Sequence, residues 1–325
     1  MNLLEVDDLS VSFRTDDGPV QAVDQVSFGV AEREVVALVG ESGCGKSVTA
    51  MSVTRLLPSN ASVTGRVLFG GADLLRMPIG ELRRVRGKEI AYVFQEPMTA
   101  LNPSFTVGFQ VQETLRHHEG MSRSDARQRA VELLDLVGIP AAERRMNEYS
   151  HQMSGGMRQR VMIAMAIACG PRLLIADEPT TALDVTVQAA ILDVLRTLRE
   201  RLGMALVLIT HDLGVVADVA DRVVVMYAGR KVEEAPVLDL FRAPQHPYTI
   251  GLLGALPVPV KGRMPERLRE IRGIVPSLGA PLPSCAFAPR CPRASAECRE
   301  RVPPLEPLAP SHLAACFHPG PEDVG

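Results

Sequence analysis

Four continuous apolar runs constrain the fold of this chain most strongly. They are EVVALVG, EIAYVFQ, PRLLIADE and MALVLITHD, and segments with a helical pattern separate them. A strand that is covered on both faces carries apolar side chains at successive positions, whereas a half-exposed strand alternates. The runs therefore predict an α/β fold with a parallel sheet covered by helices on both faces.

Each of these runs ends in residues that can do chemistry. The first leads into the glycine-rich segment 40–47, and the others end at Gln95, at Asp177-Glu178 and at His211. In an open parallel sheet, ligands bind outside the carboxyl ends of the strands. Because four strands bring polar groups to one edge, we expect the binding site there.

Other segments complete the predicted organisation. The alternating stretches LLEVDDLSVSF, VQAVDQVSFGV and VTGRVLFGG predict a small antiparallel sheet. Residues 102–170 have a mostly helical pattern, which predicts a helical subdomain inserted between the Gln95 and Asp177 strands. Of the 25 prolines, 14 fall within 257–325, so long regular elements are not expected there. We expect a main domain over 1–256 and a loop-rich extension over 257–325.

Composition excludes several functional classes. The net charge of −3 argues against a protein whose main task is gripping nucleic acid. No apolar run approaches the length of a membrane span. The N-terminus MNLLEVDDLS is acidic and lacks the basic and then apolar pattern of a signal peptide. We therefore expect the chain to stay in the cytoplasm.

The segment GESGCGKS at 40–47 fits the phosphate-loop pattern G-x-x-x-x-G-K-[ST]. Glycines let backbone N–H groups turn inward around phosphate oxygens, and the N-terminus of the following helix adds a favourable dipole. Lys46 would reach the β- and γ-phosphates, and the Ser47 hydroxyl would bind Mg²⁺. Because the segment directly follows VVALV, it predicts a nucleotide site rather than a simple glycine-rich turn.

The acidic pair suits the same nucleotide. Asp177 follows four apolar residues, so its carboxylate emerges at a strand tip, where it could bind Mg²⁺ through water. Glu178 is placed to activate the attacking water as a general base. Gln95 could sense the γ-phosphate or the metal, and His211 could donate to the γ-phosphate. Taken singly, each of these residues is more often structural.

Ser154-Gly155-Gly156 precedes a helix, and a helix N-terminus of this kind binds anions. A helix cap would explain Ser154 alone. It would not explain a second anion site so far along the chain from the phosphate loop. A single chain cannot easily fold both sites onto one nucleotide, whereas two chains facing head to tail can.

Four of the six cysteines lie in the last 41 residues, with the spacing Cys285-x5-Cys291-x6-Cys298-x17-Cys316. In a reducing compartment such a cluster favours a metal site over disulfides. The spacing lacks the paired C-x-x-C of structural zinc sites, yet four thiolates could hold zinc or a [4Fe–4S] cluster. His312 and His318 would also allow a mixed zinc site. Free cysteines are the remaining alternative.

Together these motifs resemble the ATP-binding subunits of ABC transporters, and more narrowly the dipeptide/oligopeptide (peptide/nickel) importer ATPases. The superfamily signature L-S-G-G-Q is represented here by MSGGM at 153–157, and that importer branch also commonly has Met at the last position. Similar stretches include FQEPMTALNPSFTVG, IADEPTTALDVTVQA, HPYT at 246–249 and PRCP at 289–292. The resemblance covers essentially the whole chain.

The resemblance implies an ABC-type P-loop NTPase fold with a parallel core sheet, an antiparallel β subdomain, a helical subdomain and a cysteine-containing appendix. Glu178 matches the catalytic base, His211 the switch histidine, and the segment Thr99–Phe105 the surface where the permease docks. The residues expected at ATP, including those reaching the partner's ATP, are Phe13, Gly40, Glu41, Ser42, Gly43, Cys44, Gly45, Lys46, Ser47, Val48, Gln95, Ser154, Gly155, Gly156, Asp177 and Asp184. Those expected at Mg²⁺ are Ser47, Gln95 and Asp177, and those expected to contribute to catalysis are Lys46, Gln95, Glu178 and His211.

The implied function is that of an ATP-hydrolysing subunit that powers import of di- and oligopeptides. Its implied partners are a paralogous ATPase, two permease subunits and, indirectly, a substrate-binding protein, at the cytoplasmic face of the inner membrane. Related tails resemble iron–sulfur segments, which favours a [4Fe–4S] cluster over Zn²⁺ on Cys285, Cys291, Cys298 and Cys316. Alternatives are import of nickel, murein peptide or another solute, and an ABC-type ATPase that acts on nucleic acid or ribosomes.

Overall fold

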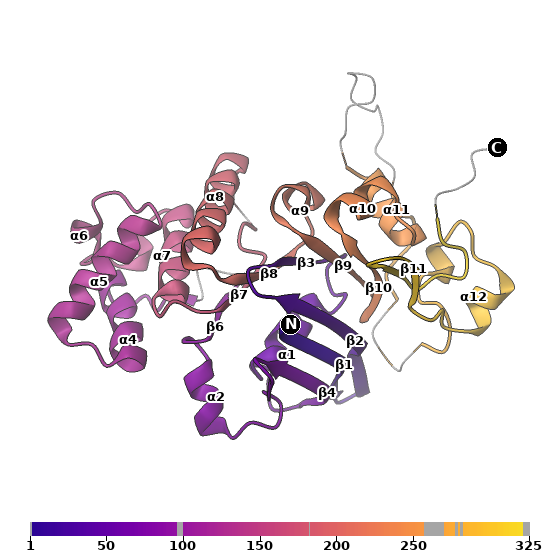
Figure 1. Ribbon diagram of the computed structural model, residues 1–325, viewed down its shortest axis with the longest axis horizontal. Helices are drawn as coiled ribbons and strands as arrows, with labels where there is room; N and C mark the ends of the chain where they lie inside the picture. The colour runs from indigo at the N-terminus through magenta and orange to yellow at the C-terminus, as the bar shows by residue number, and fades with distance from the viewer. Residues whose placement is uncertain are drawn as a thin grey trace, which may run out of the picture. The chain divides into compact units, whose positions relative to one another are not determined.

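The computed structural model describes residues 2–95, 100–181, 183–256, 270–276, 279 and 282–320 (Figure 1). The chain divides into two compact units. The first consists mainly of Val30–Glu34 and Arg76–Ile209, and the second of Leu3–Gly29, Val35–Leu75 and Thr210–Gly325.

A parallel sheet forms the core of the first unit. Its strands are β6 (Ile90–Val93), β7 (Leu173–Asp177) and β8 (Ala205–Thr210), with β7 between the other two. Val93 pairs with Ala176, and Asp177 pairs with Ile209, so the three strands end at the same edge. Every residue of β7 and β8 is buried. This confirms the sheet predicted from three of the continuous apolar runs.

Helices make up most of the rest of the first unit. They are α2 (Ile79–Val85), α4 (Val107–Glu119), α5 (Arg123–Leu136), α6 (Ala142–Arg145), the 3₁₀ turn η1 (Ser150–Gln152), α7 (Gly155–Ile167) and α8 (Val185–Leu202). Helices α4, α5 and α7 pack on one another, and α7 also contacts β6 and α8. Four of the helices begin at a side chain that accepts a backbone N–H three residues on, namely Thr106, Ser122, Ser154 and Asp184. The predicted helical segments are thus confirmed.

An antiparallel sheet in the second unit has the strand order β2-β1-β4-β5. The strands are β1 (Asn2–Thr15), β2 (Gly18–Ala31), β4 (Ala61–Phe69) and β5 (Ala72–Asp73). From Leu4 onward, the buried positions of β1 change from even to odd numbers between Val6 and Leu9. A bulge lies there, with Asp8 at a φ of 49°. An extra residue in one strand resets which face each side chain takes.

The second unit also holds a larger sheet. Strand β3 (Val35–Val39) runs parallel to β9 (Arg222–Tyr227). Beyond β9 the sheet continues with β10 (Arg230–Pro236), then β12 (His312–Ala314) and then β11 (Glu306–Ala309), each paired with the strand before it. The helices are α1 (Lys46–Val53), α9 (Leu213–Val219), α10 (Val237–Arg242), α11 (Pro247–Gly254), η2 (Ala288–Arg290) and α12 (Ala296–Glu300). Among the described residues, no helix combines the length and apolarity needed to cross a membrane.

The C-terminal residues are tied into this sheet. Strand β12 pairs antiparallel with β10, with Ala314 opposite Glu233. The fully buried Glu233 carboxylate accepts the backbone N–H of Gln245 at 2.7 Å and of His246 at 2.8 Å, and it lies 2.8 Å from His312 Nε2. The short elements agree with the proline content of the extension, but the two strands that continue the sheet were not predicted.

Candidate active site

The predicted site residues are divided between the two units. Gln95, Ser154, Gly155, Gly156, Asp177, Glu178 and Asp184 belong to the first unit, and Phe13, the loop 40–47, Val48 and His211 belong to the second.

The phosphate loop joins β3 to α1, and its glycines are required by its shape. Gly40, Gly43 and Gly45 have φ values of 151°, 79° and 97°, which other residues rarely adopt. A Cβ on Gly40 would lie 2.2 Å from the carbonyl oxygen of Met226, and one on Gly45 would lie 2.6 Å from that of Ala22. No side chain caps the start of α1, so none competes with a ligand for its first N–H groups.

Lys46 is held inside this loop. Its side chain is almost fully buried, and Nζ donates to the carbonyl oxygens of Gly40 at 2.8 Å and Glu41 at 3.0 Å. Cys44 Sγ lies 3.7 Å from the same ammonium. Burial raises the pKa of the Cys44 thiol, and the positive charge of Lys46 only partly opposes this shift. The loop therefore presents a fixed cation beside its backbone, which suits a polyphosphate ligand.

The carboxyl end of β7 holds the acidic pair in the first unit. Asp177 is buried, and its Oδ2 accepts a hydrogen bond from the Tyr92 hydroxyl at 2.8 Å. Burial and then the Asp177 charge raise the pKa of Tyr92, so the phenol remains a donor. Tyr92 was not among the predicted site residues, although it lies in the EIAYVFQ run on the neighbouring strand β6.

Glu178 has a backbone conformation that is rare for its residue type. Its φ is 44°, in the left-handed region that costs a non-glycine residue about 1–2 kcal/mol. Its Oε2 accepts hydrogen bonds from Gln95 Nε2 at 2.9 Å and from Thr181 Oγ1 at 2.8 Å. The structure thus brings together Glu178 and Gln95, which the sequence predicted at one edge, and adds Thr181. Strain of this kind collects at functional sites.

The SGG turn opens α7. Ser154 is exposed, and its Oγ accepts the Met157 N–H at 3.4 Å. A Cβ on Gly156 would lie 2.6 Å from Val187 Cγ1, so close packing against α8 gives this glycine a structural role as well. Asp184 is exposed and caps α8 through the Val187 N–H at 2.9 Å.

Two further predicted residues lie in the second unit. Phe13 is half-buried in β1 and pairs with Ala61 of β4. His211 is exposed and follows the last residue of β8. The next residue, Asp212, caps α9 by accepting the Gly214 N–H at 2.8 Å. This arrangement accounts for the strand-to-helix turn that carries His211.

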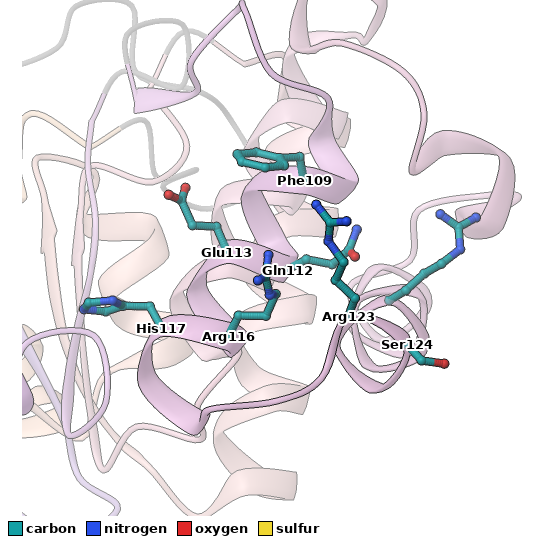
Figure 2. Close-up of a pocket in the computed structure, with 8 residues that line it drawn as sticks. Phe109, Gln112, Glu113, Arg116, His117, Arg123 and Ser124 are labelled. Carbon is teal, nitrogen blue, oxygen red and sulfur yellow. The ribbon is translucent and has the colours of Figure 1, made fainter.

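The predicted docking surface lies only partly within the described residues, because Thr99 falls outside them. Phe105 is exposed, and its ring stacks on that of Phe109 with 4.7 Å between centroids. Beside Phe109, a pocket of about 600 Å³ lies between α4 and α5 (Figure 2). Its lining residues are Phe109, Gln112, Glu113, Arg116, His117, Arg123, Ser124 and Arg127. Three arginines and one glutamate make the lining predominantly basic.

The four C-terminal cysteines line one cavity, together with Phe287 and His318. All four are free thiols. Burial raises the pKa of Cys285 and Cys291, and it raises that of Cys316 to about 11. In the absence of a metal ion, these shifts keep the thiols protonated.

The structure gives no support to the predicted metal site. The cavity between the cysteines has a volume of about 10 Å³, which is space for roughly one water molecule. In the described part of the chain, no three His, Cys, Asp or Glu side chains are placed to hold a metal ion. His312 binds Glu233 rather than facing the cysteines. Neither the [4Fe–4S] cluster nor Zn²⁺ is supported.

Two residues that hold the phosphate loop were not predicted as site residues. The Tyr248 hydroxyl accepts the Glu41 N–H at 2.7 Å, and the Arg290 guanidinium binds both carboxylate oxygens of Glu41. Tyr248 lies in HPYT and Arg290 in PRCP. Both motifs were noted as resemblances, but their position in the sequence gives no sign of this contact.

Comparison with known proteins identifies the class. Residues 23–181 match the ABC transporter family model, and residues 232–298 match that of the oligopeptide/dipeptide transporter C-terminal region. Among solved structures, the dimeric ATP-binding cassette MJ0796 bound to ADP and Pi superimposes with a TM-score of 0.65 at 29% identity. That match covers 72% of this chain and 98% of the cassette. Fold and motifs together define an ABC-type ATPase.

Proteins of similar sequence define the family within the ABC-type ATPases more closely. The chain is 53% identical to the probable peptide ABC transporter ATP-binding protein y4tR of Sinorhizobium fredii, over 97% of this chain and 94% of the relative. It is 49% identical to the dipeptide transport ATP-binding protein DppD of Escherichia coli, over 98% and 97%. The chain belongs to the family of ATP-binding subunits of peptide ABC transporters.

Proposed function

We propose that this chain hydrolyses ATP to power the import of di- and oligopeptides through an ABC transporter. The observation that carries this proposal is Glu178, held in a strained conformation by Gln95 and Thr181 at the end of β7. A carboxylate fixed in this way is suited to orient and deprotonate an attacking water molecule. The names of the relatives, which refer to peptides and dipeptides, support the choice of cargo.

Each residue then has a defined task. The loop 40–47 would hold the β- and γ-phosphates through its backbone N–H groups, with Lys46 supplying positive charge. Ser47 and Asp177 would hold Mg²⁺, with Gln95 beside them, and the ion would neutralise charge on the phosphates. Glu178 would take the proton of the attacking water, and His211 would donate to the γ-phosphate. Phe13 would stack on the adenine.

We propose further that hydrolysis takes place between two facing subunits. Ser154 and Asp184 are exposed at the first turns of α7 and α8, and Val185 beside them is 84% exposed. An apolar side chain so open to water is consistent with burial against a partner. The MJ0796 cassette is described as dimeric. The partner here would be a paralogous ATPase, as the resemblance implies.

The remaining partners would be two permease subunits, with a substrate-binding protein acting through them, and the chain would bind peripherally at the cytoplasmic face of the inner membrane. We place the permease contact at Phe105, Phe109 and the adjacent pocket between α4 and α5. Exposed stacked rings offer apolar area, and the arginines of that pocket suit an acidic segment. We propose no metal for the cysteine cavity.

The test is uptake of labelled peptides by cells that carry either the wild-type chain or Glu178→Gln. Glutamine keeps the hydrogen-bonding shape but cannot take a proton, so ATP binding should persist while ATP hydrolysis falls by about 10²–10⁴-fold. Peptide uptake should fall with it.

Labelled Ni²⁺ serves as the parallel cargo in the same cells. Loss of nickel uptake with intact peptide uptake would assign the chain to a sister importer. If both uptakes survived in cells without a redundant transporter, the proposed import function would be overturned.

A further inference from the structure

The phosphate loop is anchored by a residue from the C-terminal extension, 249 positions away in the sequence. Arg290 Nη1 lies 2.6 Å from Glu41 Oε2, and Arg290 Nη2 lies 2.9 Å from Glu41 Oε1. This is a bidentate arginine–carboxylate pair, the geometry that fixes both partners most tightly. Both residues belong to the second unit, and Glu41 is the second residue of the phosphate-loop motif.

Arg290 is built into its surroundings. Its side chain is only 4% exposed, whereas that of Glu41 is 29% exposed. Its remaining hydrogen bonds go to the carbonyl oxygens of Ile271 and Arg272, each at 3.0 Å, and to the Tyr227 hydroxyl at 3.4 Å. The hydrogen bonds to Glu41 are the main cause of a pKa raised above the usual arginine value. A guanidinium with all its donors engaged is a rigid anchor for the loop.

Glu41 transmits this anchoring to the catalytic lysine. Its N–H donates to the Tyr248 hydroxyl, its carboxylate binds Arg290, and its carbonyl oxygen accepts from Lys46 Nζ. Every polar group of Glu41 is thereby held. Any shift of Glu41 would move the carbonyl oxygen that positions the Lys46 ammonium, and it would move the N–H groups that follow it in the loop.

We propose that Arg290 is a positioning residue for nucleotide binding, acting through Glu41 to keep the phosphate loop and Lys46 in their binding arrangement. The inference rests on the proposed ATP site. It makes nucleotide affinity depend on the C-terminal extension, which contributes no residue to the phosphate-loop motif itself.

The test measures the Kd for ATP by displacement of a fluorescent ATP analogue from the purified full-length chain. Arg290→Gln should weaken ATP binding by roughly tenfold, since one charge-assisted pair is lost. Arg290→Lys retains one ion pair, so its Kd for ATP should lie between that of Arg290→Gln and that of the wild type. The double variant Glu41→Gln, Arg290→Gln should lose about as much ATP affinity as Arg290→Gln alone. Its loss should be clearly less than the sum of the two single losses, because both residues act through the same pair.

A matched control separates positioning from stability. Arg66 binds Asp7 with Nη2 at 2.6 Å in an exposed pair of the same unit, away from the loop. Arg66→Gln should leave the Kd for ATP unchanged. All Kd values are measured well below each variant's melting temperature, so that every variant is folded. If Arg290 only stabilised the fold, its substitution would lower the melting temperature and leave the Kd for ATP unchanged.

The outcomes distinguish the two proposals. If wild type fails to bind ATP, the proposed function is wrong. If wild type binds ATP and Arg290→Gln binds equally well while folded, the positioning role of Arg290 is overturned. A graded loss from wild type to Lys to Gln, absent from Arg66→Gln, supports it.

Discussion

At Glu178, the backbone preference of the residue type and the proposed catalytic role oppose each other. Its left-handed backbone is unfavourable for a side chain of this type, yet Gln95 and Thr181 bind the carboxylate and hold it there. A glycine at this position would relieve the strain, but it would remove the proposed base. The strained conformation is therefore best explained by the chemistry at the end of β7.

His246 is a second residue whose burial has a measurable consequence. It caps α11 by accepting the Tyr248 N–H on Nδ1 at 3.0 Å. Burial, and secondarily the charge of Arg293, lowers its pKa from 6.5 to about 3. The folded chain therefore keeps this imidazole neutral at pH values where an unfolded chain would protonate it.

The sign of the pH dependence follows from this shift. Below pH 6.5 the unfolded state binds a proton that the folded state refuses until about pH 3, so stability falls as the pH falls through that window. Between pH 7 and pH 5, wild type should lose about 2 kcal/mol more stability than His246→Asn, which can still cap the helix. Urea unfolding of both proteins at the two pH values measures this, and parallel losses would show that His246 contributes nothing.

At the scale of elements, β12 is attached to β10 through a buried carboxylate. Glu233→Ala would leave the N–H groups of Gln245 and His246, and the ring of His312, without their shared acceptor. We expect a loss of about 3 kcal/mol in the free energy of unfolding. Glu306→Ala, at an exposed position of the neighbouring β11, is the matched control and should change stability by less than about 0.5 kcal/mol. Equal midpoints in urea for the two variants would contradict this.

Most elements could be predicted because their signals are local. The parallel strands show as unbroken apolar runs, and α4, α5 and α7 show a helical period, so a window of ten to twenty residues suffices. The bulge at Asp8 was not predicted, although the sequence carries its trace: the apolar positions change from Leu4 and Val6 to Leu9 and Val11. Strands β11 and β12 lie in a proline-rich region. Strand β12 forms on the edge of β10, and β11 forms on β12, rather than because of their own sequence pattern.

The site residues with a local sequence signal could also be predicted. Gln95, Asp177 and Glu178 each lie at or just after the end of a strand, so parallel topology alone brings them to one edge. Arg290 and Tyr248 could not be found, because their contacts with Glu41 depend on how distant segments fold together. The cysteine spacing predicted that four thiols gather, and they do line one cavity. The spacing alone does not determine whether they hold a metal.

At the scale of the whole molecule, the proposed permease contact leads to a prediction about assembly. Arg123 lines the basic pocket between α4 and α5, and its side chain is exposed, so reversing its charge should not affect folding. Arg123→Glu should weaken co-purification of the chain with its permease by about tenfold while ATP binding stays intact.

Arg129→Glu is the control on the same helix, because Arg129 pairs with Glu132 and does not line the pocket. If both variants, or neither, lost the permease, the pocket between α4 and α5 would not be the docking site.

The bond between Arg290 and Glu41 also bears on how modular this ATPase is. A fragment ending at Leu256 would keep every motif of the ATP site, yet its phosphate loop would lack the arginine that holds it. Assays on such a fragment would then understate the nucleotide affinity of the intact chain. Exchanging extensions among relatives would likewise change ATP affinity without altering any residue of the ATP-site motifs. Related importers could then differ in the ATP concentration at which they work while sharing the same catalytic residues.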